Sequence, residues 1–345
     1  MRPSSCAGWK MFPTYAIMPL DMSAERKNNI IRLIAFILIL VILVFLLSNA
    51  MSELYLKKKP YIAGRLRCVI EVMNERPDTL DLITLGDSEA YSSFNPMTVW
   101  NEAGIPSFLL GHSAQFIGET YSELKKALKT QTPKVVLIET HGLIAEGNLA
   151  ENLGEFVKDE LKTLFPIFVY HDKWKELLTG DDKDDPNFFK GFKIKTQSMP
   201  YQGDELLQND GSNASVSSAS RFYMERIMKL CEEKGAKLML YSAPSPVNYN
   251  AATHEALTAY ASEIGVPYSD LNAENDKIGI DWKTDSIDEG DHLNVNGADK
   301  VTHYLINFIK ENGSMEDRSK DDSYKDWDAL YERYLAMKNE LENTK

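Results

Sequence analysis

The sequence is poor in cysteine and has no excess of positive charge. Its 345 residues include three cysteines, Cys6, Cys68 and Cys231, none of them in a Cys-x-x-Cys pair. Three scattered cysteines exclude a disulfide framework, and no Cys/His cluster has the spacing of a zinc site. The formal net charge is −13, so a nucleic-acid partner, which requires a basic surface, is not expected. A glycine-rich phosphate loop is also missing, and we expect no metal and no cofactor.

One long stretch contains only apolar residues, from Leu33 to Leu47. With its neighbours it forms a segment at 30–51 whose helix would be about 30 Å long, the thickness of a bilayer core. We therefore predict a transmembrane helix at 30–51, retained as a signal anchor, that ties the chain to the membrane bilayer. Ser48-Asn49-Ala50 also has the pattern of a cleavage site, which leaves a removed signal peptide as the alternative.

The apolar segment divides the chain into unequal parts. We expect a short disordered segment at 1–29 and a connector at 52–79 that includes a helix at 61–75. An α/β domain would follow at 80–312, and a charged helix at 313–345 would pack its aromatic residues on the domain. Because basic residues flank the apolar segment on both sides, they do not decide its orientation in the membrane.

Short apolar runs alternate with helical patterns through most of the domain. Strands are expected at residues 81–85, 107–110, 134–138 and 237–241, and near Pro267. The alternation predicts an α/β fold with a mostly parallel sheet flanked by helices on both faces. From about 142 to 220 the alternation stops, which indicates an insertion with some helix at 149–164, acting as a lid or a wall over a site.

A candidate nucleophile stands directly after the first strand, in Gly86-Asp87-Ser88. A serine at the carboxyl end of a parallel strand lies where the sites of α/β proteins form, and Gly86 gives the turn its conformational freedom. Because a serine hydroxyl is a weak nucleophile, it needs a base. His292, which precedes the last helix of the domain, is the candidate. Each motif taken alone also fits a plain structural role, as a turn or a helix start.

Acidic residues precede the candidate base in Asp288-Glu-Gly-Asp291-His292. A carboxylate behind the imidazole would hold the tautomer that a base requires. Asp288 can fold back across one turn, whereas Asp291 faces away from the ring in a regular backbone, because adjacent side chains diverge. We therefore rank Asp288 first, Asp291 second and Glu289 third as the acid.

The Gly-Asp-Ser block near the start and the Asp-His block near the end resemble those of the SGNH (GDSL-type) hydrolase superfamily, over roughly residues 80–312. The chain is similar in particular to the membrane-anchored, DltD-like proteins of bacterial envelope modification. Besides the anchor, the further matches are Gly111 with Gln115, Pro133-Lys134, His292-Leu-Asn294 and Gly297-Ala298. The resemblance implies a flavodoxin-like three-layer sandwich and an extracytoplasmic position for the domain.

The resemblance also implies an oxyanion hole and its residues. The backbone amides of Ser88 and Gly111 would form the hole, and Asp87 and Gln115 are further site candidates. The superfamily has an Asn after the third strand, where this chain reads Glu139-Thr-His-Gly.

Two histidines follow neighbouring strands. His112 and His141 either line the same pocket or are ordinary histidines at the edge of the core.

These residues, together with the resemblance, lead us to expect a membrane-anchored extracytoplasmic serine esterase or O-acyltransferase. The resemblance and the anchor imply that it acts on acyl esters of a cell-envelope polysaccharide or teichoic-acid-like polymer, through an acyl-serine at Ser88. By analogy with the anchored relatives, a multispanning membrane acyltransferase is an expected partner. The alternative is a non-catalytic binding or scaffolding module of an envelope-modification complex on the same fold. The acidic run at 181–185 is a weaker candidate for docking a partner protein.

Overall fold

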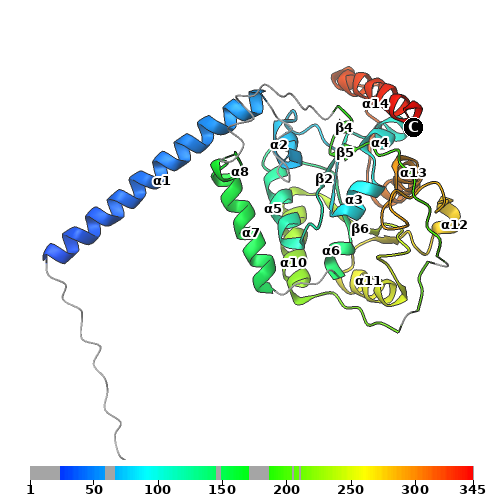
Figure 1. Cartoon of the computed structure of the whole chain (residues 1–345), viewed down its shortest axis with the longest axis horizontal. Coiled ribbons are helices and arrows are strands. Elements are labelled where there is room, and N and C mark those ends of the chain that lie inside the picture. The colour runs from blue at the N-terminus through cyan, green and yellow to red at the C-terminus, as the bar shows by residue number, and fades with distance from the viewer. Residues whose placement is uncertain are drawn as a thin grey trace, which may run out of the picture.

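The computed structural model describes residues 24–58, 67–144, 149–170, 186–203, 206–209 and 211–344. A long N-terminal helix, α1 (Ala24–Lys58), extends away from an α/β domain (Figure 1). Among the described residues, one helix is long and apolar enough to cross a membrane, over Ala24–Met51, and none of its most apolar part is buried in the protein.

The helix α1 extends beyond the expected transmembrane segment, 30–51, at both ends. Residues 24–29, expected to be disordered, and 52–58, expected to belong to the connector, are helical. The physical reason is that neither proline nor glycine interrupts the chain between Ala24 and Pro60. The connector helix appears as α2 (Arg67–Asn74), and residues 59–66 lie outside the described part.

The centre of the domain is a parallel sheet of five strands in the order β2-β1-β3-β6-β7. The strands are β1 (Leu82–Gly86), β2 (Ser107–Gly111), β3 (Val135–Glu139), β6 (Lys237–Ser242) and β7 (Tyr268–Asp270). Nearly all their residues are buried, as expected for a parallel sheet covered on both faces. The predicted fold class is confirmed.

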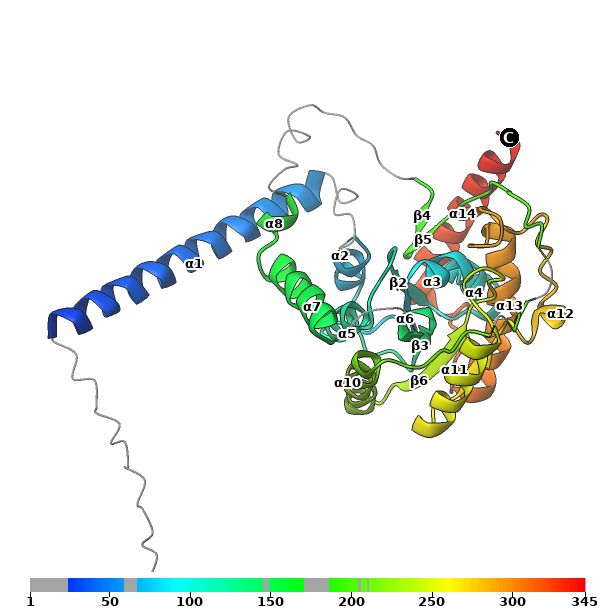
Figure 2. The same ribbon diagram turned by 60° about the horizontal axis from the view of Figure 1, so that its bottom comes forward.

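Helices cover both faces of this sheet (Figures 1 and 2). On one side lie α5 (Ile117–Ala127), α10 (Ser218–Lys234) and α11 (Ala251–Ile264). On the other lie α3 (Ser88–Ser93), α4 (Pro96–Ala103) and α13 (Val295–Asn312). The short helix α12 (Asn275–Ile278) precedes α13.

The C-terminal residues form α14 (Lys325–Asn343), which follows a 3-10 turn at Asp322–Tyr324. Trp327 is buried, and its ring centroid lies 5.3 Å from that of Trp100 in α4. Tyr334 is also buried and accepts a hydrogen bond from Asn95 Nδ2 at 2.9 Å. These aromatic contacts hold α14 on the domain.

The insertion between β3 and β6 divides into two parts. The first holds α6 (His141–Ile144), α7 (Leu149–Leu164) and α8 (Ile167–Tyr170). The second holds a small hairpin, β4 (Phe188–Phe189) and β5 (Phe192–Lys193), and an extended stretch after it. α7 packs beside α5, where Ser122 Oγ donates to Glu160 Oε1 at 2.7 Å. The acidic run at 181–185 lies outside the described residues.

Candidate active site

The candidate nucleophile lies in the turn between β1 and α3, at the carboxyl edge of the sheet. Gly86 closes β1 in register with Gly111 of β2. A Cβ at Gly86 would lie 2.7 Å from the Cβ of Ala90 and 2.8 Å from that of Glu139. Only glycine therefore fits where the chain turns toward Ser88.

Ser88 is the first residue of α3 and is half-buried. Asp87 caps this helix, and its carboxylate accepts a hydrogen bond from the Glu89 N–H at 3.0 Å. Tyr91 follows Ser88 by three residues, so the two side chains lie on the same face of α3. The Tyr91 ring stacks on the imidazole of His292, with centroids 6.4 Å apart and planes at 8°. Ser88 and His292 therefore lie at the same edge of the sheet.

A tight turn folds Asp288 back onto His292. Asp288 Oδ2 lies 2.7 Å from His292 Nδ1, and its Oδ1 accepts a hydrogen bond from the His292 backbone N–H at 2.6 Å. Positive φ angles at Glu289 (61°) and Gly290 (97°) reverse the chain between the two residues. Glu289 contributes its backbone to this turn and forms none of the ion pairs of His292 within the described part of the chain.

The other ring nitrogen of His292, Nε2, is buried and has no hydrogen-bond partner among the described residues. Because Asp288 faces Nδ1, it favours the tautomer with the proton on Nδ1. No hydrogen bond joins Nε2 to Ser88 among the described residues, and the lone pair of Nε2 is left to act as a base.

Asp291 is less well placed to orient the imidazole. Its Oδ2 is 3.3 Å from His292 Nδ1. Its Oδ1 accepts a hydrogen bond from the side-chain amide of Asn248, which also donates to Glu89 Oε1 at 2.7 Å. Asp291 is therefore bound to Asn248, while Asp288 is directed at the ring.

A second imidazole–carboxylate pair lies next to the nucleophile turn. His141 Nδ1 is 2.6 Å from Asp87 Oδ2. The His141 backbone N–H donates to Glu139 Oε2 at 2.9 Å, and Glu139 Oε1 accepts from the Ala243 N–H at 3.2 Å. The buried Glu139 side chain thus joins the ends of β3 and β6 beside Asp87.

Burial shifts the pKa values of the ionisable groups around Asp87, which are Glu89, Glu139 and His141. Burial raises the pKa of Glu139 to about 8, and the negative charge of Asp87 adds to the rise. Burial also raises the pKa of Glu89 well above its usual value, and the charge of Glu139 adds to it. For His141, burial lowers the pKa, but the hydrogen bond and charge of Asp87 outweigh it and bring the pKa to about 10. The Asp87–His141 ion pair and the raised pKa values of Glu139 and Glu89 therefore limit the negative charge that accumulates beside Ser88.

The Glu139→Gln protein is expected to gain stability over the wild type as the pH rises from about 5 to about 8.5. The folded-state pKa of about 8 lies above the usual value of 4.5, so the folded chain keeps a proton that the unfolded chain releases. Between these values Glu139 lowers the wild-type free energy of unfolding by at most about 1.4 kcal/mol per pH unit, whereas glutamine does not titrate. Differential scanning calorimetry across this pH range measures the difference.

Glu233→Gln is the matched control for this experiment. Glu233 lies on α10 with 57% of its side chain exposed, 3.9 Å from Lys229, so its variant should follow the wild-type pH profile. Identical profiles for Glu139→Gln and the wild type would contradict the raised pKa.

Two further sequence candidates have different surroundings. A Cβ at Gly111 would lie 3.2 Å from the carbonyl oxygen of Gly86, so Gly111 touches the nucleophile turn. The amide of Gln115 is used within its own loop: Oε1 accepts from the His112 N–H at 3.1 Å, and Nε2 donates to Thr120 Oγ1 at 3.0 Å. Gln115 therefore shapes the loop after β2, and the structure does not bring its amide to Ser88.

Part of the insertion lies beside the candidate site. After β5 the chain passes Tyr91, and Lys195 Nζ lies 4.8 Å from the centroid of that ring. The Val295 N–H donates to the carbonyl of Lys195 at 2.9 Å, and the Met199 N–H donates to the carbonyl of Ser286, also at 2.9 Å. Among the described residues of the insertion, this stretch forms a wall near His292.

Three side chains with metal-ligand chemistry also meet here. One donor atom from each of Glu89, Asp291 and His292 lies within 4.8 Å of the others. The Asn248 amide donates a hydrogen bond to both carboxylates. Glu89 and Asp291 therefore already have a neutral protein side chain as their partner. We assign the cluster no metal role.

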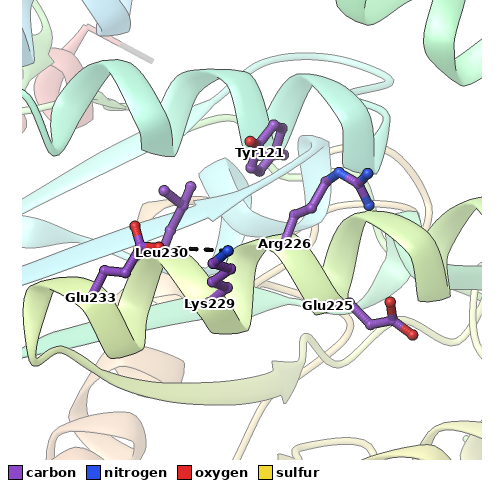
Figure 3. A pocket seen from close by; sticks show the side chains of 6 residues that line it. All are labelled: Tyr121, Glu225, Arg226, Lys229, Leu230 and Glu233. Atoms are coloured by element: carbon purple, nitrogen blue, oxygen red, sulfur yellow. Dashed lines mark ion pairs between the residues drawn. The ribbon is translucent and has the colours of Figure 1, made fainter.

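Two hollows in the described part of the structure lie away from this edge. A groove of about 480 Å³ runs between α5 and α10 (Figure 3). Its lining residues are Tyr121, Glu225, Arg226, Lys229, Leu230 and Glu233. A second hollow of about 580 Å³ lies between α2, the β4–β5 hairpin and α14. None of the residues lining either hollow belongs to the cluster around Ser88.

Sequence reasoning missed several members of this cluster. Glu139 ends a buried strand and Asn248 lies in a loop after β6, so neither stands out in the sequence. The position of each at the carboxyl end of a strand was the available signal. Of the two strand-end histidines, His141 joins the cluster, whereas the His112 imidazole lies 3.2 Å from Glu123 of α5.

Comparisons with known proteins found similar solved structures. No family model matches the sequence, and no curated protein matches it. A Bacteroides fragilis protein assigned as an acylhydrolase is 12% identical, with a TM-score of 0.38 over 70% of this chain and 93% of its own. The lipase/acylhydrolase from Enterococcus faecalis is 12% identical, with a TM-score of 0.36 over 69% of this chain and 99% of its own. A GDSL-like lipase from Bacteroides thetaiotaomicron is 12% identical, with a TM-score of 0.36 over 72% and 98%. Because these TM-scores are below 0.5, the assignment of function depends on the side chains of this chain alone.

Proposed function

We propose that this chain is a serine esterase or O-acyltransferase of the SGNH type. The observation that carries the proposal is the Asp288–His292 pair, with Nδ1 and Oδ2 2.7 Å apart and Nε2 buried without a partner among the described residues, at the same sheet edge as Ser88. A serine, an imidazole and a carboxylate in that order form the arrangement that activates a hydroxyl for acyl transfer.

The reaction proceeds through an acyl-serine. Ser88 Oγ attacks the ester carbonyl, and His292 Nε2 takes the hydroxyl proton and then returns it to the leaving alcohol. Asp288 stabilises the imidazolium that forms in between. Attack of water on the acyl-serine releases the acid, whereas attack of a polymer hydroxyl transfers the acyl group, so the two reactions differ in the acceptor.

The oxyanion is stabilised in this proposal by the backbone N–H groups of Ser88 and Gly111. His141 supplies the third donor, at the position where the superfamily has an Asn. Its Nδ1 is bound to Asp87, so its charged ring presents Nε2–H as the remaining donor. A cation fixed by an ion pair stabilises a developing negative charge without reorganising.

Replacing His141 tests this role. The His141→Ala protein is expected to lose about 100-fold or more in kcat with little change in KM, because the lost interaction forms in the transition state. His141→Asn, which restores an amide, should recover part of the rate. Steady-state kinetics with p-nitrophenyl acetate measure both. A similar loss in both variants with a raised KM would mean that His141 acts only by holding the loop.

The proposed location and substrate rest on α1 and on the resemblance of the motifs. α1 anchors the chain in the membrane as a single-pass helix, with the large domain on the extracytoplasmic side. The substrate is an acyl ester of a cell-envelope polysaccharide or teichoic-acid-like polymer. A multispanning membrane acyltransferase is the proposed partner.

Product analysis with the full chain in detergent distinguishes hydrolysis from transfer. An esterase releases nitrophenol from p-nitrophenyl acetate at a rate that does not change when a soluble polysaccharide is added. A transferase speeds up with the acceptor and leaves acetyl ester on it, which mass spectrometry detects. A folded chain that does neither contradicts both forms of the proposal and favours the binding or scaffolding module.

A further inference from the structure

A stripe of exposed apolar side chains runs along α7 and into α8. Its members recur every three or four residues and are 45 to 53% exposed: Leu153, Val157, Leu161, Leu164 and Phe168. This spacing places them on one face of the helix. α7 also packs on α5, where Ser122 Oγ donates to Glu160 Oε1 at the margin of the stripe. An apolar stripe of this length on a surface helix marks a binding face.

The position of α8 indicates what covers this stripe. α8 packs on α1, and the ring of Phe165, just before α8, meets the ring of Phe45 edge-on, with centroids 6.3 Å apart. Phe45 lies inside the apolar stretch that ends at Met51, about 9 Å from that end along the helix. If α1 crosses a bilayer, Phe165 and α8 therefore reach the depth of the acyl chains.

The direction of α7 fits the surface of the same bilayer. In both views α7 lies between α1 and α5, on the side of the domain toward which α1 extends, and runs across the direction of α1 (Figures 1 and 2). A helix that crosses the axis of a membrane anchor near its end lies along the membrane surface. α8, which carries Phe168 of the stripe, packs on α1, so the stripe ends beside the exposed apolar side chains of α1.

We propose that α7 and α8 form an interfacial membrane-binding element, with this stripe immersed among the lipid acyl chains beside α1. Such helices insert about 5 to 10 Å into the boundary between headgroups and acyl chains. The inference rests on the proposed membrane anchoring by α1. According to this proposal, α7 and α8 hold the domain against the bilayer in addition to α1. This second contact fixes the orientation of the domain relative to the membrane.

Site-directed spin labelling of the full chain in liposomes tests this contact. Single cysteines replace Val157, Leu161 or Leu164 in a Cys6→Ser background, since Cys68 and Cys231 are buried. Lys158→Cys, at an exposed position one residue along α7, is the matched control. Accessibility is measured to oxygen, which concentrates in lipid, and to a water-soluble nickel chelate. We expect the three stripe positions to show a several-fold higher oxygen-to-nickel ratio than Lys158→Cys.

Two results would overturn the proposal. Nickel accessibility at the stripe equal to that at Lys158→Cys would place α7 in water. Protection from both reagents would mean that a protein surface, such as a second copy of the chain, covers it. A label at Leu40, in the middle of α1, separates this proposal from the anchor: lipid exposure there with water exposure on α7 removes only the interfacial element, whereas nickel access at Leu40 removes the anchor itself.

Discussion

The Ser88→Ala and His292→Ala proteins are each expected to lose about 1,000-fold or more of the wild-type kcat toward p-nitrophenyl acetate. Ser88 supplies the atom that forms the acyl bond, and His292 Nε2 is the proposed acceptor of its proton. Because the two residues act as one unit, the double variant should be no slower than either single variant. Steady-state kinetics of the three proteins, with folding checked by circular dichroism, measure the effect.

Ser92→Ala is the matched control for this series. Ser92 lies on the same helix, is buried, and its hydroxyl has no hydrogen-bond partner among the described residues. Its loss should leave kcat unchanged. Equal activity of Ser88→Ala and Ser92→Ala would mean that Ser88 is not the nucleophile, whatever activity the chain has.

The Asp288→Asn protein is expected to lose about 1,000-fold or more in kcat, and the Asp291→Asn protein less than about tenfold. Asp288 Oδ2 lies 2.7 Å from His292 Nδ1 and sets the tautomer, whereas an asparagine amide can donate to Nδ1 and favour the wrong one. Asp291 is bound to Asn248 and lies farther from the ring, at 3.3 Å. The change should fall on kcat with KM little altered, because the binding surface is kept.

These two isosteric substitutions serve as controls for each other, because they lie in one turn and remove the same charge. Equal losses in both would show that the net negative charge near His292 matters more than the position of one carboxylate. A larger loss for Asp291→Asn would assign the acid to Asp291 and leave Asp288 as a capping residue of the turn.

Local sequence patterns predicted the sheet and the ends of its strands. The strands are short runs of buried aliphatic residues closed by glycine or a polar residue, as in Leu82–Gly86 and Ser107–Gly111. Such runs satisfy the burial of a parallel sheet without information from distant residues. The return of Asp288 to His292 was also foreseeable, since it depends on a turn of only a few residues.

The cluster around the nucleophile turn was not foreseeable in the same way. Asn248 joins Glu89 to Asp291 only because helix α3 and two separate loops meet at one edge of the sheet. The pKa values of Glu139 and His141 depend on burial and on Asp87, which the fold alone supplies. Gln115 was a candidate because of its place in a motif, but the path of its loop turns its amide to Thr120.

The length of α1 was also underestimated from hydropathy. The apolar residues define the part that fits a bilayer, but the helix continues through polar residues until the chain approaches Pro60. Helix ends depend on breakers and caps more than on hydropathy.

The most direct test of the central claim is labelling of the full-length chain with a serine-reactive fluorophosphonate, followed by peptide mass spectrometry. The account predicts one phosphonate on Ser88 Oγ in the wild type, much slower labelling in His292→Ala, and none at that position in Ser88→Ala. A folded wild-type chain that leaves Ser88 unlabelled, or that carries the label on another serine, would contradict it.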